Sequence, residues 1–198
     1  MEWFYQGSAR GAKVAFNLLA RWEVSGRENV PKEGPVIVAA NHTSYLDPPL
    51  LMASVGRRIR FLAHMGLFHH PLFGLLARGI NTLPVDREAG SSAITRKVLR
   101  DLDKGSAIGL FPEGTRSLNG DLGKGKSGIA YIALKSGACV LPVGIAGTHR
   151  IRTVTDALKR PAVGIRIGQP FLLPQPKNRP QKEQIESFAN DIMERIAT

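Results

Sequence analysis

Short apolar runs alternate with helical segments along most of this 198-residue chain, and this alternation constrains the fold more than any other feature. The run Val36–Ala40 is typical, because it begins with β-branched residues and is bounded by Pro35 and Asn41. We expect further strands at 58–63, 81–85, 107–111, 139–145 and 162–167. Strands that alternate with helices predict an α/β fold, with a mostly parallel or mixed central sheet flanked by helices on both faces.

Apolar residues at helical spacing lie between these strands. We expect helices at 47–55, 67–78, 91–104, 127–136 and 181–197, and a short strand and turn at 23–34. The helix that begins at Asp47 has a start signal, because a carboxylate can act as N-cap and the two prolines after it need no amide bond. With 43% apolar residues the chain can bury a sizeable core, and we expect residues 23–198 to form a single α/β domain.

Residues 1–22 form the first expected helix, and it is amphipathic. Its apolar face is expected to hold Tyr5, Ala9, Ala12, Phe16 and Leu19, and its basic face Arg10, Lys13, Asn17 and Arg21. Aromatic and aliphatic residues beside basic ones are typical of a helix that lies in a membrane interface. The alternative is a helix packed on the protein's own core, and the exposure of the apolar face distinguishes the two.

The sequence predicts no segment that crosses a bilayer. The longest uncharged run, 61–77, has 17 residues and contains proline and glycine, whereas a spanning helix needs about 20 predominantly apolar residues. The N-terminus also lacks the apolar stretch and cleavage site of a signal peptide.

A single cysteine, Cys139, excludes an internal disulfide framework and a multi-cysteine metal site. We therefore expect an intracellular protein. The sequence contains no cluster of ligand residues for a metal, and we expect no metal and no other cofactor. Because Cys139 lies in an apolar strand, we expect its thiol to be buried and unreactive.

The net charge of +11 favours anionic partners: phosphorylated metabolites, acidic lipid surfaces, an acidic carrier protein or nucleic acid. The aromatic residues argue against nucleic acid, because they cluster in apolar runs instead of alternating with basic residues as in a stacking platform. We therefore expect no nucleic-acid partner.

The first candidate site, residues 41–47, begins where a predicted strand ends and closes where a helix begins. Functional sites of α/β sheets lie at such strand ends. His42 can exchange a proton near neutral pH, and Asp47 can hold one ring nitrogen so that the other acts as a base. A tight loop brings two residues at this separation together. The alternative is that Asp47 only caps the helix and that His42 is an ordinary loop residue.

The second candidate site, residues 111–117, also follows a predicted strand. Gly114 lets the backbone approach an anion, and the planar guanidinium of Arg116 grips phosphate or carboxylate through two bonds. Glu113 can orient that arginine or accept a hydrogen bond from a substrate hydroxyl. Basic residues follow among glycines before a helix N-terminus, where backbone amides and the helix dipole favour anions. The residues expected to bind an anionic substrate here are Glu113, Gly114, Thr115, Arg116, Lys124 and Lys126.

Asn41-His42 with Asp47 resembles the His-(X4)-Asp motif of the glycerolipid acyltransferases. The segments 79–87, 111–117 and 140–142 look like that family's second, third and fourth motif blocks, in the same order. The resemblance covers roughly residues 26–150. It implies an α/β acyltransferase fold and peripheral or monotopic attachment to the cytoplasmic face of the membrane. It also implies transfer of a fatty acyl group from acyl-CoA or acyl-carrier protein to the hydroxyl of lysophosphatidic acid, giving phosphatidic acid.

The resemblance also implies roles for individual residues. His42 is then the general base and Asp47 its partner. Glu113, Gly114 and Arg116 would hold the phosphate of the acceptor.

Three further residues are expected at the substrate by the same resemblance. Asn41 precedes the histidine of the motif, and Arg87 would lie near the acceptor's phosphate, although it can instead pair with the acidic residue on either side. Many relatives carry Ala-Lys where this chain has Ala63-His64, and that lysine is thought to help bind phosphate. His64 offers less positive charge near neutral pH, so the sequence predicts the reaction type more firmly than the acceptor.

Two other functions remain open from the sequence. One is acyl transfer to a different lysolipid acceptor, and the other is a non-catalytic basic module that binds a lipid surface.

Overall fold

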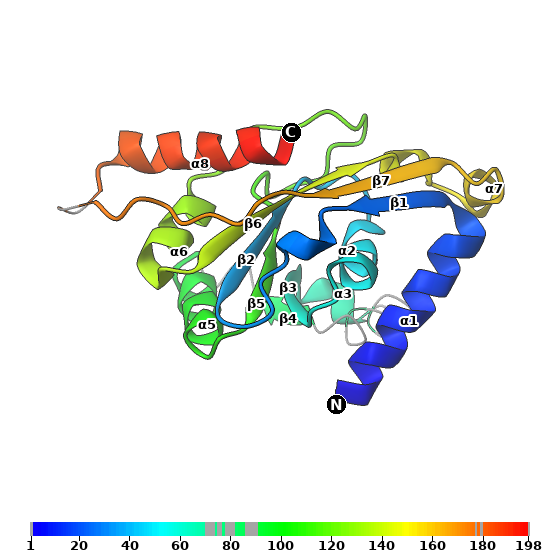
Figure 1. Ribbon diagram of the computed structural model, residues 1–198, viewed down its shortest axis with the longest axis horizontal. Coiled ribbons are helices and arrows are strands. Elements are labelled where there is room, and N and C mark those ends of the chain that lie inside the picture. Colours follow the sequence, from blue (N-terminus) through cyan, green and yellow to red (C-terminus); the bar gives the residue numbers. More distant parts are fainter. Residues whose placement is uncertain are drawn as a thin grey trace.

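The computed structural model describes residues 2–69, 74, 77, 82–85, 91–176, 178 and 180–197. Its strands are β1 (Arg21–Ser25), β2 (Val36–Ala40), β3 (Ile59–His64), β4 (Thr82–Val85), β5 (Ala107–Leu110), β6 (Cys139–Ala146) and β7 (Ala162–Ile167). They form one seven-stranded sheet in the order β1-β7-β6-β2-β5-β3-β4 (Figure 1). Every neighbouring pair is parallel except β6 and β7. The predicted α/β fold with a mixed, mostly parallel sheet is confirmed.

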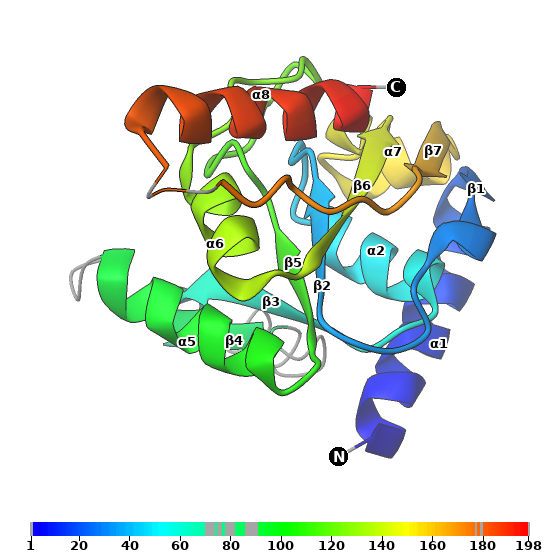
Figure 2. The same ribbon diagram turned by 60° about the vertical axis from the view of Figure 1, so that its left-hand side comes forward.

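Helices cover both faces of this sheet (Figures 1 and 2). One face carries α1 (Glu2–Leu19) and α2 (Asp47–Val55), and the other carries α5 (Ser91–Asp103), α6 (Gly128–Ser136) and α8 (Lys182–Ala197). Shorter elements connect the strands: η1 (Arg27–Asn29), α3 (Gly66–His69), η2 (Thr148–Arg150) and α7 (Val154–Leu158).

The central strand β2 contributes to the core on both sides of the sheet. Val36, Val38 and Ala40 belong to the apolar cluster under α1 and α2. Ile37 and Ala39 belong to the cluster under α5, α6 and α8. A strand buried on both faces is a continuous apolar run in the sequence. Because β2 lies between β5 and β6 and runs parallel to both, the segments that follow these three strands start at the same edge of the sheet.

The N-terminal helix ends earlier than its apolar spacing predicts. α1 stops at Leu19, and residues 21–25 form β1, which pairs in parallel with β7. The expected helix through Trp22 is therefore wrong. The Trp22 ring packs against Phe16, with ring centroids 5.9 Å apart, and this contact is made from a strand. An aromatic residue at this position fits the helical period and also suits the alternating burial of β1. Residue spacing alone therefore does not distinguish a helix from a strand at Trp22.

The apolar face expected for this helix packs on the domain. Tyr5 and Phe16 are buried, and the Tyr5 hydroxyl donates to the carbonyl of Arg57 and accepts from the amide of Ile59. A different apolar set is exposed along the helix. This exposed set is Trp3, Phe4, Val14 and Leu18, whereas Leu19 is the member of the expected apolar face that does not pack on the domain, since it is 40% exposed. The alternative of a helix packed on the protein's own core therefore applies to one face of α1, and a second apolar face is left in contact with solvent.

Two further elements differ from the sequence patterns. The patterns predict no helix at 154–158, where the structure has α7, since five residues are too few to show a helical period. A capping box between Thr153 and Asp156 begins this helix. The helix expected at 67–78 begins as α3, and most of its remaining residues lie outside the described ranges. Within the described ranges, no helix is long and apolar enough to cross a membrane.

Gly109 in β5 makes room for the buried ring of Phe61, its neighbour in β3. A Cβ atom added at Gly109 would lie 2.5 Å from that ring. We predict that Gly109→Ala lowers the free energy of unfolding by about 1–3 kcal/mol, because the ring must leave its place in a packed core. Urea denaturation measures this loss. Gly164→Ala is the matched control, since a Cβ there has no atom within 4 Å; equal stability of the two variants would contradict the packing described.

Candidate active site

His42 and Asp47 meet at the C-terminal end of β2. The Nδ1 atom of His42 lies 2.8 Å from Oδ2 of Asp47. The carboxylate is completely buried, whereas 17% of the histidine side chain is exposed. The loop between them therefore brings the two predicted residues together and leaves the imidazole within reach of a ligand.

Further donors converge on the Asp47 carboxylate. Oδ2 accepts the backbone amides of Thr43 and Ser44, each at 2.7 Å. Oδ1 accepts the hydroxyl of Thr148 at 2.7 Å, and that hydroxyl in turn lies 2.7 Å from the hydroxyl of Thr43. A buried carboxylate needs such donors to remain ionised. As an acceptor it directs the proton of the neutral imidazole to Nδ1, which leaves Nε2 of His42 as the basic nitrogen.

The predicted N-cap role of Asp47 is wrong. The N-cap position of α2 is Leu46, and no side chain caps this helix. The Asp47 carboxylate instead binds amides of the preceding loop, at Thr43 and Ser44. The carboxylate therefore shapes the loop that carries His42. The first turn of α2 instead contains two prolines, which need no hydrogen-bond acceptor there because they have no N–H.

An aromatic stack fixes the plane of the imidazole. The ring of Phe111, directly after β5, lies parallel to that of His42, with centroids 4.0 Å apart. Phe61 stacks behind Phe111 at 6.3 Å. Stacking sets the plane of the His42 ring and the Asp47 bond sets its rotation within that plane. Among the residues that the structure describes, Nε2 has no hydrogen-bond partner, so it is available to a substrate.

Glu113 and Asn41 are used inside the protein. The two buried oxygens of Glu113 accept the amides of His42 and Gly123, each at 2.7 Å. The amide group of Asn41 makes two bonds with the backbone of Ile145 in β6. The sequence suggests substrate contacts for both residues. The geometry favours a different role, in which they fasten the loops that position His42.

Arg116 is brought next to the His42 loop by an aromatic residue. Its guanidinium carbon lies 3.6 Å above the ring centre of Tyr45, which belongs to that loop and is 58% exposed. The backbone joins the same two loops, since the amide of Ser117 donates to the carbonyl of His42. The predicted anion-binding arginine therefore lies at the edge of the site that holds the imidazole.

Lys126 lies over the turn that Gly114 makes. Gly114 has a φ of +68°, and a Cβ added there would lie 2.8 Å from Nζ of Lys126. The amide of Lys126 also donates to the carbonyl of Pro112. The turn thus combines an exposed backbone with a nearby ammonium group. Thr115 and Lys124 are exposed on the same segment, and no contact ties either of them to His42.

Two predicted binding residues cannot be placed in this way. Arg87 lies outside the described residues. His64 is the last residue of β3, where its backbone pairs with Val85 of β4. Their expected contacts with substrate stay predictions.

Sequence reasoning missed Thr148 and the partnership of Tyr45 with Arg116. Thr148 is fully buried, begins η2, and lies 101 residues after the aspartate that it binds. Its only signal in the sequence is its place after the end of a strand that neighbours β2.

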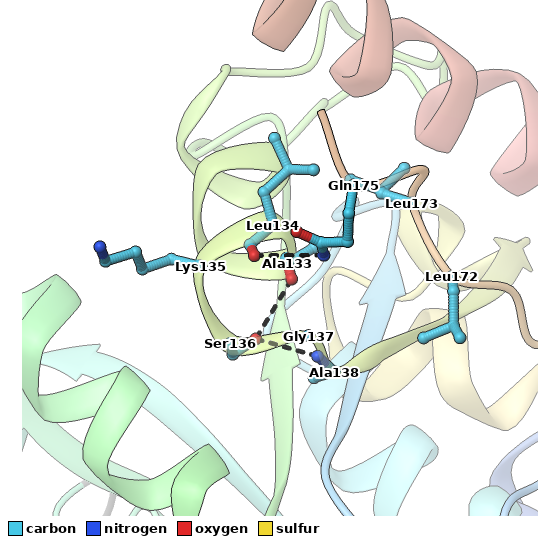
Figure 3. Close-up of a pocket in the computed structure, with 9 residues that line it drawn as sticks. All are labelled: Ala133, Leu134, Lys135, Ser136, Gly137, Ala138, Leu172, Leu173 and Gln175. Atoms are coloured by element: carbon cyan, nitrogen blue, oxygen red, sulfur yellow. Dashed lines mark hydrogen bonds between the residues drawn. The ribbon is translucent and has the colours of Figure 1, made fainter. Parts of the chain in front are cut away.

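The hollow drawn in Figure 3 lies elsewhere, at the C-terminal end of α6. Its volume is about 430 Å³, and it is lined by residues 133–138 together with Leu172, Leu173 and Gln175. The bonds drawn there end the helix: the Ser136 hydroxyl accepts the amide of Ala138, and Gln175 donates to the carbonyl of Leu134. These groups complete the end of a helix, and His42 is not among the lining residues.

Comparison with known proteins shows the family of this chain. A family model described as Acyltransferase matches residues 21–146, which run from β1 to the end of β6 and include both candidate loops. The chain belongs to the acyltransferase family. The resemblance seen in the sequence is confirmed. Thr148 and α7 lie beyond the part that the family model matches.

Relatives of this acyltransferase chain carry similar names. A 1-acyl-sn-glycerol-3-phosphate acyltransferase of Bacillus subtilis is 26% identical over 195 residues, which are 97% of this chain and 94% of that protein. A chloroplastic enzyme of the same name from Arabidopsis thaliana is 34% identical over 143 residues, which are 71% of this chain. The chain spans 40% of that plant protein and 51% of a Borreliella burgdorferi relative.

A solved structure extends the similarity to nearly the whole of this chain. The crystal structure of the 1-acyl-sn-glycerophosphate acyltransferase from Thermotoga maritima superposes with a TM-score of 0.76 at 30% sequence identity. The match covers 96% of this chain and 77% of that one.

Thr148 offers a test of the buried network. We predict that Thr148→Val lowers the free energy of unfolding by about 1–3 kcal/mol, because Asp47 and Thr43 each lose a buried partner. Thr148→Ser keeps the hydroxyl and is expected to lose less. Urea denaturation compares the variants, and equal losses for valine and serine would show that the hydroxyl contributes nothing.

Cys139 is expected to react slowly. Burial raises the pKa of its thiol, and the charge of Arg57 offsets only part of that effect. We predict that iodoacetamide at neutral pH alkylates the native protein much more slowly than the urea-unfolded chain, as mass spectrometry measures. The Cys139 side chain is only partly buried, so the expected full burial is not confirmed. Equal rates in the two states would contradict the protection that this partial burial gives and would reopen the thiol as a candidate nucleophile.

Proposed function

We propose that this acyltransferase moves a fatty acyl group from an acyl thioester, acyl-CoA or acyl-carrier protein, to the free hydroxyl of lysophosphatidic acid, giving phosphatidic acid. One observation carries the proposal: Nδ1 of His42 is bound to a fully buried carboxylate, which leaves Nε2 as a base beside the turn that contains Gly114 and Arg116, with Lys126 over it. We call this turn the cationic turn. The names of the relatives support lysophosphatidic acid as the acceptor.

The reaction follows from the position of the base. Nε2 of His42 takes the proton of the acceptor hydroxyl while the hydroxyl oxygen bonds to the thioester carbonyl carbon. The tetrahedral intermediate then collapses, the carbon–sulfur bond breaks, and the thiolate leaves and takes the proton back from the imidazolium. The Asp47 carboxylate stabilises that imidazolium. No covalent acyl-enzyme is needed, and base catalysis of this kind is typically worth about 10²–10⁴-fold in rate.

The cationic turn supplies the recognition of phosphate. Arg116 provides a planar donor fork, Lys126 provides a point charge over the turn, and Gly114 has no side chain of its own between the backbone and a bound anion. The ring of Tyr45 supports the guanidinium of Arg116 and so holds it beside the His42 loop. An acceptor whose phosphate binds here can present its hydroxyl to Nε2.

The exposed face of α1 gives this enzyme a route to its lipid substrates. Trp3, Phe4 and Leu18 are exposed on a helix that also carries Arg10 and Lys13. Apolar and basic residues combined in this way suit a helix in the interface of a membrane that contains anionic lipids. The protein is then a peripheral membrane protein of the cytoplasmic face, where thioester donors are made.

The first test replaces the base. We predict that His42→Ala lowers kcat by about 10²–10⁴-fold, because the hydroxyl then has no proton acceptor. The assay supplies lysophosphatidic acid with either acyl-CoA or acyl-carrier protein and follows phosphatidic acid. His69→Ala, an exposed histidine of α3, is the control. Transfer by His42→Ala at the wild-type rate would remove the proposed mechanism. Vesicle binding by a wild-type protein that transfers no acyl group would favour the non-catalytic lipid-binding alternative.

The second test concerns the phosphate. Arg116→Ala is expected to raise KM for lysophosphatidic acid by about tenfold or more, since a charge-assisted pair is lost. Tyr45→Leu is expected to raise it by about two- to fivefold, and Tyr45→Phe, which keeps the ring, much less. Monoacylglycerol lacks the phosphate and should not distinguish these variants. An unchanged preference for the phosphorylated acceptor in Arg116→Ala would contradict the assignment.

A further inference from the structure

The segment 150–160, which contains α7, exposes large aliphatic side chains outside the candidate site. Val154 is 76% exposed and Leu158 is 70% exposed. They are separated by one helical turn and therefore lie on the same side of α7. Ala157 is buried, which shows that an adjacent side of this short helix packs on the domain. An aliphatic pair of this kind has no partner among the described residues.

The same segment is strongly basic. Its exposed cations are Arg150, Arg152, Lys159 and Arg160. Its single acid, Asp156, accepts the hydroxyl and amide of Thr153 and the amide of Arg152. The hydrogen bond from Thr153 is the main reason that the pKa of Asp156 is lowered. The Asp156 carboxylate is bound within this capping box. The surface around the aliphatic pair is therefore cationic.

Two arginines connect this segment to neighbouring parts of the protein. The guanidinium of Arg160 donates to the carbonyl of Asn17, near the end of α1. The guanidinium of Arg152 donates to the carbonyl of Leu118, which follows the cationic turn and is 63% exposed. Both views place α7 at the corner of the molecule where β1 and β7 lie (Figures 1 and 2). Thr148, which binds the Asp47 carboxylate, lies just before the segment.

We propose that residues 150–160 form a second membrane contact, in which Val154 and Leu158 enter the acyl-chain boundary and the surrounding arginines and lysine bind anionic lipid headgroups. The positive charge favours an anionic membrane as the partner. Aliphatic side chains surrounded by cations match a bilayer surface, which has an apolar interior beneath anionic headgroups. The binding of membranes by this segment does not depend on the proposed function, but the use of that binding in catalysis rests on it. Contacts at α7 and at α1 would hold the edge with His42 against the layer from which a lysolipid comes.

The test measures vesicle binding of the full chain by sedimentation. Vesicles of phosphatidylcholine with phosphatidylglycerol are compared with vesicles of phosphatidylcholine alone. We expect Val154→Ser with Leu158→Ser to lower the partition coefficient on anionic vesicles by about tenfold or more. Leu172→Ser is the matched control, since Leu172 is 66% exposed and lies beside the hollow of Figure 3. Thermal unfolding verifies that each variant remains folded.

The charge is tested in the same assay. Lys159→Glu is expected to weaken binding to anionic vesicles by several-fold and to leave phosphatidylcholine vesicles unaffected, whereas Lys135→Glu on α6 is the control. Unchanged vesicle binding in the Val154 and Leu158 double variant would overturn the proposal. Loss of self-association in that variant, measured by light scattering and without a change in vesicle binding, would also overturn it and assign the surface to a second copy of the chain.

These outcomes are separate from those of the proposed function. Transfer to a water-soluble, short-chain lysophosphatidic acid by the unaltered protein tests the chemistry without a membrane. Failure of that transfer would contradict the proposed function, and failure of the vesicle experiment alone would contradict only the contact at α7.

Discussion

A single buried charge organises the candidate site. The Asp47 carboxylate is removed from water, and such a group is costly unless donors surround it. Three of its donors come from residues 42–44 and the fourth, Thr148, follows β6. Their convergence shapes the loop after β2 and sets the direction of the His42 ring. The mechanism depends on that direction more than on any other feature of the fold.

The sheet supplies the framework for this convergence. Because β5, β2 and β6 are adjacent and parallel, the segments after them leave the same edge. Glu113 binds the loop after β2 to the loop after β5, and Asn41 binds it to β6. Phe111 then stacks on the imidazole from the side of β5. Three strands that are distant in the sequence thus place the His42 imidazole beside the turn that carries Gly114 and Arg116.

The sequence predicts those parts that depend on local patterns. The strand at 36–40 and the pairing of His42 with Asp47 are local, so apolar runs and loop length suffice to find them. Thr148 acts across 101 residues, and the stacking of Arg116 on Tyr45 depends on side-chain packing, so neither has a local pattern. The apolar spacing predicts the end of α1 too late, because Trp22 fits both a helix and a strand. The α7 helix is too short to show a period, and only its capping box distinguishes it from a loop.

The proposed mechanism requires that Nδ1 of His42 donates to Asp47 and that Nε2 is therefore the base. Nitrogen NMR spectroscopy of the isotope-labelled protein measures this most directly, with His42→Ala identifying the signals of this ring. We expect the neutral imidazole to carry its proton on Nδ1, with a proton resonance shifted downfield by the bond to Asp47, and Nε2 to be unprotonated. A neutral imidazole protonated on Nε2 would contradict it.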